Sequence, residues 1–145
     1  MRVVAQIVRN ATLTINQKVY SEIHYGLFLL VSFTFGDSAE TAEKMADKVM
    51  KMRVFPDFEG KTNLDIMAVG GEILSVSQFT LYGDFKGRRP SFTRVLPGAQ
   101  SRELYDIFNK ALSQSLKVKT GVFGEMMDIN FTNVGPATYL LESDE

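Results

Sequence analysis

The sequence contains no cysteine, no tryptophan and a single histidine among its 145 residues. Without cysteine, the chain can form no disulfide, no thiolate zinc site and no cysteine nucleophile. Any Ser-His or Thr-His catalytic pair has to use His24, which we interpret as structural or solvent-facing. These absences remove most standard hydrolytic machinery, and we expect no metal and no other cofactor.

Long apolar runs and a strong net charge are absent as well. The most apolar stretch covers residues 26–35, about half of the roughly 20 residues that a membrane-crossing helix requires, and the first residues show no secretory signal. We therefore expect one cytoplasmic domain over residues 1–145. Because the net charge is only −1, a partner as anionic as nucleic acid needs a local basic patch.

Hydrophobic spacing predicts strands near both ends of the chain and two helices between them. The first helix, of about four turns, is indicated by an apolar stripe of Ala42, Met45, Ala46, Val49 and Met52 or Arg53, and we expect a capping box of Asp37 and Glu40 to open it. The second helix is predicted over residues 101–116. The predicted strands cover residues 2–8, 12–15, 18–23, 25–33, 72–82, 117–120, 126–132 and 138–141. This pattern is typical of an α+β domain whose mostly antiparallel sheet is covered on one face by two helices.

The end of one predicted strand, Ser77-Gln78-Phe79-Thr80-Leu81-Tyr82, places three polar side chains among apolar neighbours. Buried polar groups cost about 1 to 3 kcal/mol each unless they are paired. The segment therefore predicts either a functional site or a sheet edge at which hydroxyl groups pair across strands.

A second motif, Asn133-Val134-Gly135-Pro136-Ala137-Thr138, combines glycine and proline. Glycine accepts unusual dihedral angles, whereas proline lacks a backbone donor and can adopt a cis bond. On this pattern alone we interpret the motif as a hairpin turn. The alternative is a loop that offers its backbone to a ligand or to another chain.

Between these motifs lies a basic segment over residues 83–94. It carries Lys86, Arg88, Arg89 and Arg94 against Asp84, a net charge of 4 minus 1, or +3, and two phenylalanines are interleaved with the cations. Such a composition suits phosphate contacts and base stacking. A solvated, flexible loop is the alternative.

Taken together, the two motifs resemble the paired signature of the D-aminoacyl-tRNA deacylase family. The resemblance also includes Met1-Arg2-Val3-Val4, the basic stretch Lys86-Gly87-Arg88-Arg89-Pro90-Ser91-Phe92 and the segment Thr120-Gly121-Val122-Phe123-Gly124. It implies a barrel-like, deacylase-type fold, a homodimer and a tRNA partner. The implied activity is hydrolysis of the ester between a D-amino acid, or mischarged glycine, and the terminal ribose of tRNA, as proofreading in trans.

The resemblance also implies roles for particular residues. Ser77, Gln78, Phe79 and Thr80 are expected to form the catalytic floor of a pocket at the dimer interface. Main-chain N–H groups near Phe79 and Thr80 are expected to stabilise the oxyanion while the ribose 2′-hydroxyl helps to activate water. We assign Thr80 to positioning, because an unactivated hydroxyl is a poor nucleophile.

Other implied residues bind the substrate. Gly135 and Pro136, joined by a cis bond, are expected to reach into the partner's pocket, hold the α-amino group and leave no room for an L side chain. Phe123 and Met127 match positions near the terminal adenosine. The expected tRNA contacts are Lys86, Arg88 and Arg89.

Three positions depart from the family pattern. Ile7 stands where the family usually has arginine, Val134 where aspartate is common, and Ala137 where valine is common. One alternative is therefore a deacylase of relaxed selectivity, with a trans Gly-Pro bond and a pocket that admits small L-residues. Another is a tRNA-binding module without turnover.

Overall fold

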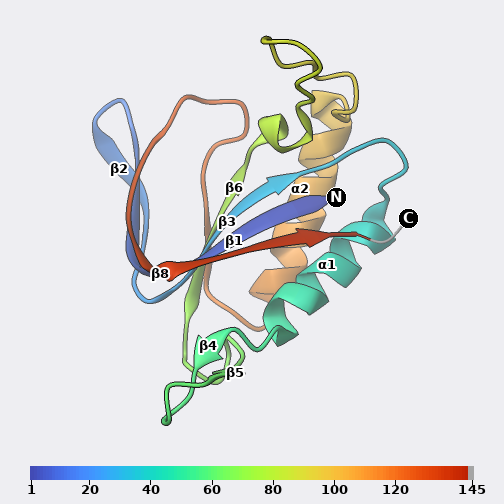
Figure 1. Cartoon of the computed structure of the whole chain (residues 1–145). Coiled ribbons are helices and arrows are strands. Elements are labelled where there is room, and N and C mark those ends of the chain that lie inside the picture. The colour runs from blue at the N-terminus through green and yellow to red at the C-terminus, as the bar shows by residue number, and fades with distance from the viewer. Residues whose placement is uncertain (144–145) are drawn as a thin grey trace.

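The computed structural model describes residues 1–143, in which two helices cover one face of a six-stranded sheet (Figure 1). The predicted α+β class, the mostly antiparallel sheet and the two helices on one face are confirmed. In chain order the elements are β1 (Arg2–Ile15), β2 (Lys18–Ile23), β3 (Gly26–Ser32), α1 (Ala39–Lys51), β4 (Phe55–Pro56), β5 (Thr62–Leu64), β6 (Glu72–Ser77), the 3-10 helix η1 (Phe79–Tyr82), α2 (Gly98–Ser113), β7 (Val118–Thr120) and β8 (Asp128–Glu142).

The long strand β1 organises the sheet. Its first half lies between β3 and β8, and its second half lies between β2 and β8, all antiparallel. Strands β3, β6 and β7 continue the sheet in parallel, and β4 pairs with β5 apart from it. Because β1 exchanges β3 for β2 along its length, the sheet curls into a nearly closed, barrel-like form.

Two apolar layers result from the alternation of side chains along β1 and β3. Val3, Ala5 and Ile7 face the helices and join the larger core, in which α1 contributes its predicted stripe. The smaller core lies on the opposite side of the sheet, inside the curl. Its buried members are Val8, Ala11, Leu13, Ile23, Phe28, Leu74 and Val76.

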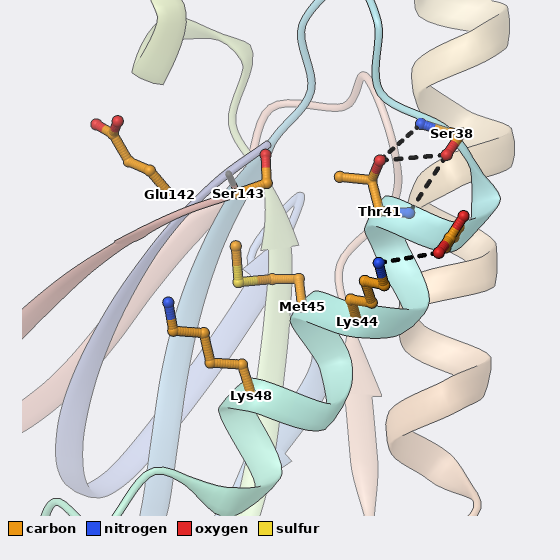
Figure 2. Close-up of a pocket in the computed structure, with 8 residues that line it drawn as sticks. Ser38, Thr41, Lys44, Met45, Lys48, Glu142 and Ser143 are labelled. Carbon is orange, nitrogen blue, oxygen red and sulfur yellow. Dashed lines mark hydrogen bonds and ion pairs between the residues drawn. The ribbon is translucent and has the colours of Figure 1, made fainter. Parts of the chain in front are cut away.

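The N-cap of helix α1 lies one residue later than predicted. Ser38 is the N-cap, and its hydroxyl and that of Thr41 each accept a hydrogen bond from the other residue's backbone N–H (Figure 2). The expected capping box of Asp37 and Glu40 is therefore wrong. Asp37 instead accepts a hydrogen bond from the N–H of Thr34.

Three other predicted boundaries are wrong for physical reasons. The strand predicted over residues 72–82 ends at Ser77. Its last pair with β3 is Val31 with Ser77, close to the end of β3, and beyond it the chain turns into η1. The second helix begins at Gly98, earlier than predicted, because Pro97 accepts from the N–H of Ser101 and starts the helix with residues that lack an apolar signal. It also ends earlier, at Ser113.

The predicted strands over residues 126–132 and 138–141 are one strand, β8. Both halves pair with β1, in the pairs Val8↔Asn133 and Gln6↔Thr138. The motif between them is therefore no hairpin turn, because the chain does not reverse. Residues 134–137 instead form an outward excursion of β8 opposite Ile7, which we call the Gly-Pro bulge. Among residues 1–143, no helix is long and apolar enough to cross a membrane.

Candidate active site

The floor segment, residues 77–82, is anchored at the ends of the two central strands. The N–H of Gln78 donates to the carbonyl of Val31 at 2.8 Å, which adds one more bond to the ladder of β6 on β3. The Ser32 hydroxyl donates to the Phe79 carbonyl at 3.4 Å. From Phe79 the chain follows one turn of 3-10 helix, closed by a 2.9 Å bond from Gly83 N–H to the Thr80 carbonyl.

Beside this segment lies a cavity of about 170 Å³. Ser77, Phe79 and Phe123, which the sequence predicted as site residues, all line it. The other lining residues are Ser32, Phe33, Val95, Leu96, Gly98 and Ser101. Since none of these nine side chains ionises near neutral pH, the cavity wall offers hydroxyl and main-chain groups but no side-chain acid or base.

Two donors at the start of η1 have no protein acceptor. Within residues 1–143, neither the N–H of Phe79 nor that of Thr80 donates to another protein group, whereas Gln78 and Leu81 both have acceptors. The first N–H groups of a helix lack intrahelical partners for geometric reasons. A pair of adjacent free donors beside a cavity can bind an oxyanion.

Thr80 has no histidine to activate it. His24 precedes the start of β3, and its N–H donates to the Glu72 carboxylate at 2.7 Å. Thr80 follows the other end of the parallel pair, which runs from Gly26 beside Glu72 to Val31 beside Ser77, about 16 Å at the usual rise per residue. His24 and Thr80 therefore lie at opposite ends of β6.

Tyr82, the last residue of η1, does not supply a base either. Burial raises the pKa of Tyr82 to about 12, so the phenol stays protonated at neutral pH. Within residues 1–143, no group of three or more His, Asp or Glu side chains is arranged to hold a metal ion. The chemistry that this site can offer consists of hydrogen bonds from hydroxyl and main-chain groups.

Phe123 and Met127 have separate locations. Phe123 lies between the cavity and α2, with its ring centroid 6.1 Å from that of Tyr105. Met127 packs against the smaller core and is not among the residues that line the cavity. The structure thus brings only Phe123 to the floor segment.

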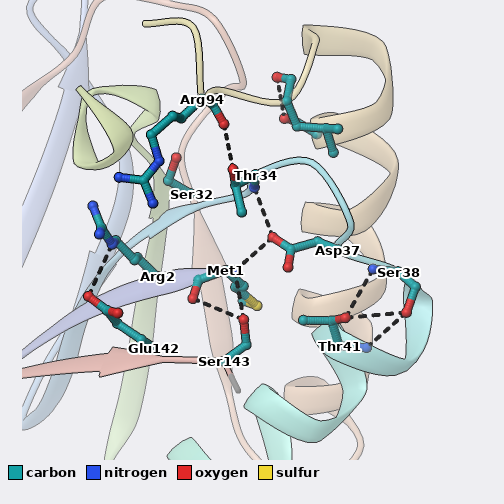
Figure 3. A network of polar contacts seen from close by, with 12 residues as sticks. Met1, Arg2, Ser32, Thr34, Asp37, Ser38, Thr41, Arg94, Glu142 and Ser143 are labelled. Atoms are coloured by element: carbon teal, nitrogen blue, oxygen red, sulfur yellow. Dashed lines mark hydrogen bonds and ion pairs between the residues drawn. The ribbon is translucent and has the colours of Figure 1, made fainter. Parts of the chain in front are cut away.

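A polar network connects the start of β1 with the end of β3 near the cavity (Figure 3). The Met1 ammonium pairs with the Asp37 carboxylate at 2.7 Å, and burial lowers the pKa of this ammonium despite the carboxylate beside it. Asp37 accepts from the Thr34 N–H at 2.8 Å, and the Thr34 hydroxyl donates to the Arg94 carbonyl at 2.6 Å. The network fixes residues 95–96, which line the cavity.

The sequence patterns included Met1, Arg2, Asp37 and Arg94, but they predicted none of the contacts of this network or of Arg2 beside it. Arg2 alternates with Val4 and Gln6 on the face of β1 that turns away from the helices. A charged side chain that shares a sheet face with an apolar one is rarely buried without a specific partner. This pattern in the sequence could have identified Arg2 as a residue with such a partner.

The Gly-Pro bulge lies apart from the floor segment of the same chain. Its Gly135-Pro136 peptide bond is cis, in agreement with the expectation, and both residues are exposed. The bulge lies opposite Ile7, whereas Arg2 touches the floor segment through Leu81. Five residues of strand, about 17 Å, separate these two points along β1. One chain therefore does not bring the two motifs together.

The basic segment forms a finger over residues 84–91. Two backbone hydrogen bonds, 2.8 and 2.7 Å, join Asp84 and Ser91 at its base. Lys86, Arg88 and Arg89 are all exposed on the finger, which projects as the yellow-green loop beyond the ends of the strands (Figure 1). Phe92, just after the finger, packs edge-on against Phe79 with 5.0 Å between ring centroids. The finger and the floor segment are therefore adjacent.

A second cavity lies elsewhere. It measures about 260 Å³ and is lined by the start of α1 and the end of β8 (Figure 2). None of the predicted site residues contributes to it.

Comparison with known proteins agrees with the motifs. The family model described as D-Tyr-tRNA(Tyr) deacylase matches residues 4–142. A D-aminoacyl-tRNA deacylase of Listeria monocytogenes serotype 4a (strain HCC23) is 50% identical, over 100% of this chain and 97% of that protein. One of Anoxybacillus flavithermus (strain DSM 21510 / WK1) is 48% identical, over 99% of each.

Solved structures share the fold. One, described as a c-Myc DNA unwinding element binding protein, has a TM-score of 0.95 and 34% identity over 100% of both chains. Another, described as a probable eukaryotic D-amino acid tRNA deacylase, has a TM-score of 0.85 and 18% identity over 97% of both chains, a likeness of fold alone. The fold and the matches define the class of the protein: it is a hydrolase. The chain belongs to the D-aminoacyl-tRNA deacylase family, as its motifs predicted.

Proposed function

We propose that this protein is a cytoplasmic homodimer that hydrolyses the ester of D-aminoacyl-tRNA, and of mischarged Gly-tRNA, in trans. The observation that carries the proposal is the cavity at which Ser77, Phe79 and Phe123 meet, beside two unpaired N–H groups and with no ionisable side chain in its wall. Membership of the family indicates the reaction, and the cavity is the site at which we propose that the ester binds.

The proposed mechanism relies on the main chain and on the substrate. Water adds to the ester carbonyl while the ribose 2′-hydroxyl accepts its proton, and the N–H groups of Phe79 and Thr80 stabilise the resulting oxyanion. The bond from the acyl carbon to the ribose oxygen then breaks, and that oxygen leaves with the proton that the 2′-hydroxyl had accepted from water. Thr80 positions the substrate. Two observations support this division of roles: His24 lies at the other end of β6, and among residues 1–143 the Thr80 hydroxyl forms no hydrogen bond with a histidine or carboxylate side chain.

An open apolar patch supports the homodimer. Val4 pairs with both Leu140 and Leu30, so the three side chains share the sheet face that turns away from the helices. Leu140 is 62% exposed, and Phe131 nearby on β8 is 38% exposed. Burying such a patch against a second copy removes apolar area from water at about 25 cal/mol per Å².

The same face explains how two copies complete the site. In a two-fold symmetric dimer, each copy contacts the other through the same surface. The floor segment touches this face at Arg2, and the Gly-Pro bulge lies about 17 Å along the strand. A second copy on this face can therefore place each bulge at the other's cavity, where the carbonyls of Gly135 and Pro136 hold the α-amino group and exclude an L side chain.

The finger is the proposed contact for the tRNA backbone. Lys86, Arg88 and Arg89 are exposed and flank the aromatic pair of Phe79 and Phe92. Phosphate contacts make affinity fall with salt, by a slope of about 0.7 per phosphate on a single strand. Replacing all three cations with alanine should reduce the slope of log affinity against log salt by about 2.

The decisive experiment is single-turnover release of amino acid from D-Tyr-tRNA, L-Tyr-tRNA and Gly-tRNA, with EDTA present. Rapid loss of the D and glycyl esters with the L ester intact is expected. Equal loss of all three esters would indicate relaxed selectivity. Tight tRNA binding without turnover would instead favour a nucleic-acid-binding module, the second candidate, which the DNA-element-binding description of a 34% identical structural neighbour favours.

A further inference from the structure

Arg2 makes two directed contacts with the end of η1 and a third with Glu142 of β8, which is drawn as a dashed line in Figure 3. Its Nη1 donates to the Leu81 carbonyl at 2.8 Å. Its guanidinium carbon lies 4.5 Å from the centroid of the Tyr82 ring. Its Nε donates to the Glu142 carboxylate at 3.1 Å, which fixes the guanidinium plane from β8.

These contacts act on the residues that follow the two free donors. A 3-10 turn has three residues per turn, so η1 is little more than one turn long. Fixing the carbonyl of Leu81 and the ring of Tyr82 therefore restricts the rotation of the turn as a whole. The directions of the Phe79 and Thr80 N–H groups depend on that rotation.

The fold itself does not require this side chain. The backbone of Arg2 is already held by its neighbours, Ser32 of β3 on one side and Glu142 of β8 on the other. The side chain is 23% exposed and contributes nothing to either apolar core. Its contacts with η1 thus have a function separate from the formation of the strand.

We propose that Arg2 is a positioning residue for ester hydrolysis: it orients η1 so that the Phe79 and Thr80 N–H groups meet the oxyanion. The inference rests on the proposed function. Misplacing a catalytic group by a fraction of an ångström to 1 Å costs up to about a hundredfold in rate. The oxyanion exists only after water adds to the ester, so Arg2 affects kcat and leaves KM nearly unchanged.

Two variants of Arg2 test the inference by single-turnover and steady-state hydrolysis of D-Tyr-tRNA. Arg2→Met keeps the unbranched stem of the side chain but removes the guanidinium and its contacts, and kcat should fall roughly ten- to hundredfold with KM within about threefold. Arg2→Lys keeps one donor for Leu81 but not the planar fork, so it should recover part of kcat. Amide hydrogen exchange at Phe79 and Thr80 should be faster in Arg2→Met.

Arg53→Met is the matched control. Like Arg2, Arg53 donates to a backbone carbonyl, in its case from Nε to that of Asn63 at 2.7 Å, but it follows α1 and lies outside the site. Its kcat should equal that of the wild type. The inference is wrong if Arg2→Met retains kcat within twofold, if its loss falls on KM alone, or if Arg2→Lys recovers nothing. Absence of turnover by the wild type contradicts the proposed function instead, so the two failures are distinguishable.

Discussion

The floor segment and the Gly-Pro bulge carry the two sequence motifs, but they differ in how the rest of the fold holds them. Contacts from β1 and β3 hold the floor segment: Arg2 binds Leu81, Ser32 binds Phe79, and Val31 binds Gln78. The bulge is held by two side chains of its own strand: Asn133 Nδ2 donates to the carbonyls of Ile7 and Ala137 at 3.0 and 3.1 Å, and the Thr138 hydroxyl donates to the carbonyl of Pro136 at 3.1 Å.

This difference in anchoring suits the two regions to different roles. A segment fixed from several elements can keep its main-chain donors in one direction, as an oxyanion site requires. The bulge leaves Gly135 and Pro136 exposed, so its carbonyls are available to a group outside the chain. The floor segment is thus fixed within one copy, whereas the bulge presents an exposed surface, which under the proposed function acts on a second copy.

The largest effect should follow from changing the bulge. A Cβ added at Gly135 would overlap the amide nitrogen of Ala137 and approach its Cα at 2.8 Å and its Cβ at 2.9 Å, so Gly135→Ala must displace the bulge. Hydrolysis of D-Tyr-tRNA should fall about a hundredfold or more, because a misplaced recognition group loses the near-attack geometry. Because Gly135 is exposed, the melting temperature should change little. An unchanged D-ester rate would refute selection by this bulge.

A mixture of two impaired variants tests whether the bulge acts on the partner's site. If the bulge acts across the dimer, a mixed dimer of Gly135→Ala with Phe123→Ala contains one site built entirely from unchanged residues. Random exchange between equal amounts of the two variants should then restore about a quarter of wild-type activity, since half of the dimers are mixed and each has one intact site. If the bulge acts on its own chain, mixing restores nothing.

On the floor side, Phe123→Ala should have the next largest effect. Phe123 lines the cavity, and stacking of a base on an aromatic ring contributes about 1 to 3 kcal/mol. KM for D-Tyr-tRNA should therefore rise roughly ten- to hundredfold while kcat changes less. Met127→Ala is the informative comparison: Met127 is absent from the cavity wall, so the variant should raise KM much less than Phe123→Ala. Equal effects on KM would show that the adenosine contacts both residues.

Thr80→Ala should have a smaller effect on activity. The single histidine, His24, lies at the opposite end of β6, and among residues 1–143 the Thr80 hydroxyl forms no hydrogen bond with a carboxylate, so no base is placed to activate it as a nucleophile. Rapid-quench kinetics should show a rate within about tenfold of wild type, as for loss of a positioning hydrogen bond. A covalent acyl-enzyme in the wild type, or complete loss of activity in the variant, would overturn this assignment.

The extent to which the sequence predicted this arrangement differs between the two regions. The candidate floor was predicted from a contiguous run, Ser77 to Thr80, because its signal is local: polar residues where an apolar strand ends. The bulge was mistaken for a hairpin because its geometry depends on β1. Whether a Gly-Pro pair reverses the chain depends on the strand with which the following residues pair, and that contact spans more than a hundred residues.

Two other side chains show the same dependence on the fold. Met127, whose contact with the adenosine stays a prediction, lies only four residues beyond Phe123, yet it packs into the smaller core, since the chain enters β8 at Asp128. Arg2 acts on Leu81 across 79 residues, a contact that no local pattern encodes. Helices and buried strands were predicted from periodicity, whereas long-range polar contacts required the fold.

The smallest expected effect concerns the strand on which the floor segment is built. Glu72 begins β6, where its carboxylate accepts from the His24 N–H and pairs with Lys117 Nζ at 3.2 Å. The hydrogen bond from His24, followed by the pairing with Lys117, holds the pKa of Glu72 below its usual value of 4.5. A lowered carboxyl pKa stabilises the fold above pH 4.5, and this contribution is lost as the pH falls through the folded-state pKa.

Glu72→Gln, which cannot ionise, should therefore lower the free energy of unfolding by about 1 kcal/mol at neutral pH. The difference from wild type should disappear in acid, once Glu72 is protonated in the folded state as well. Urea unfolding at several pH values measures both effects. Glu43→Gln, an exposed glutamate on α1 that forms no ion pair among the described residues, should show neither. Glu72 lies at the far end of β6 from the floor segment, so kcat of Glu72→Gln should stay at the wild-type value. A loss of kcat would mean that contacts along the whole of β6 are needed to hold the floor segment.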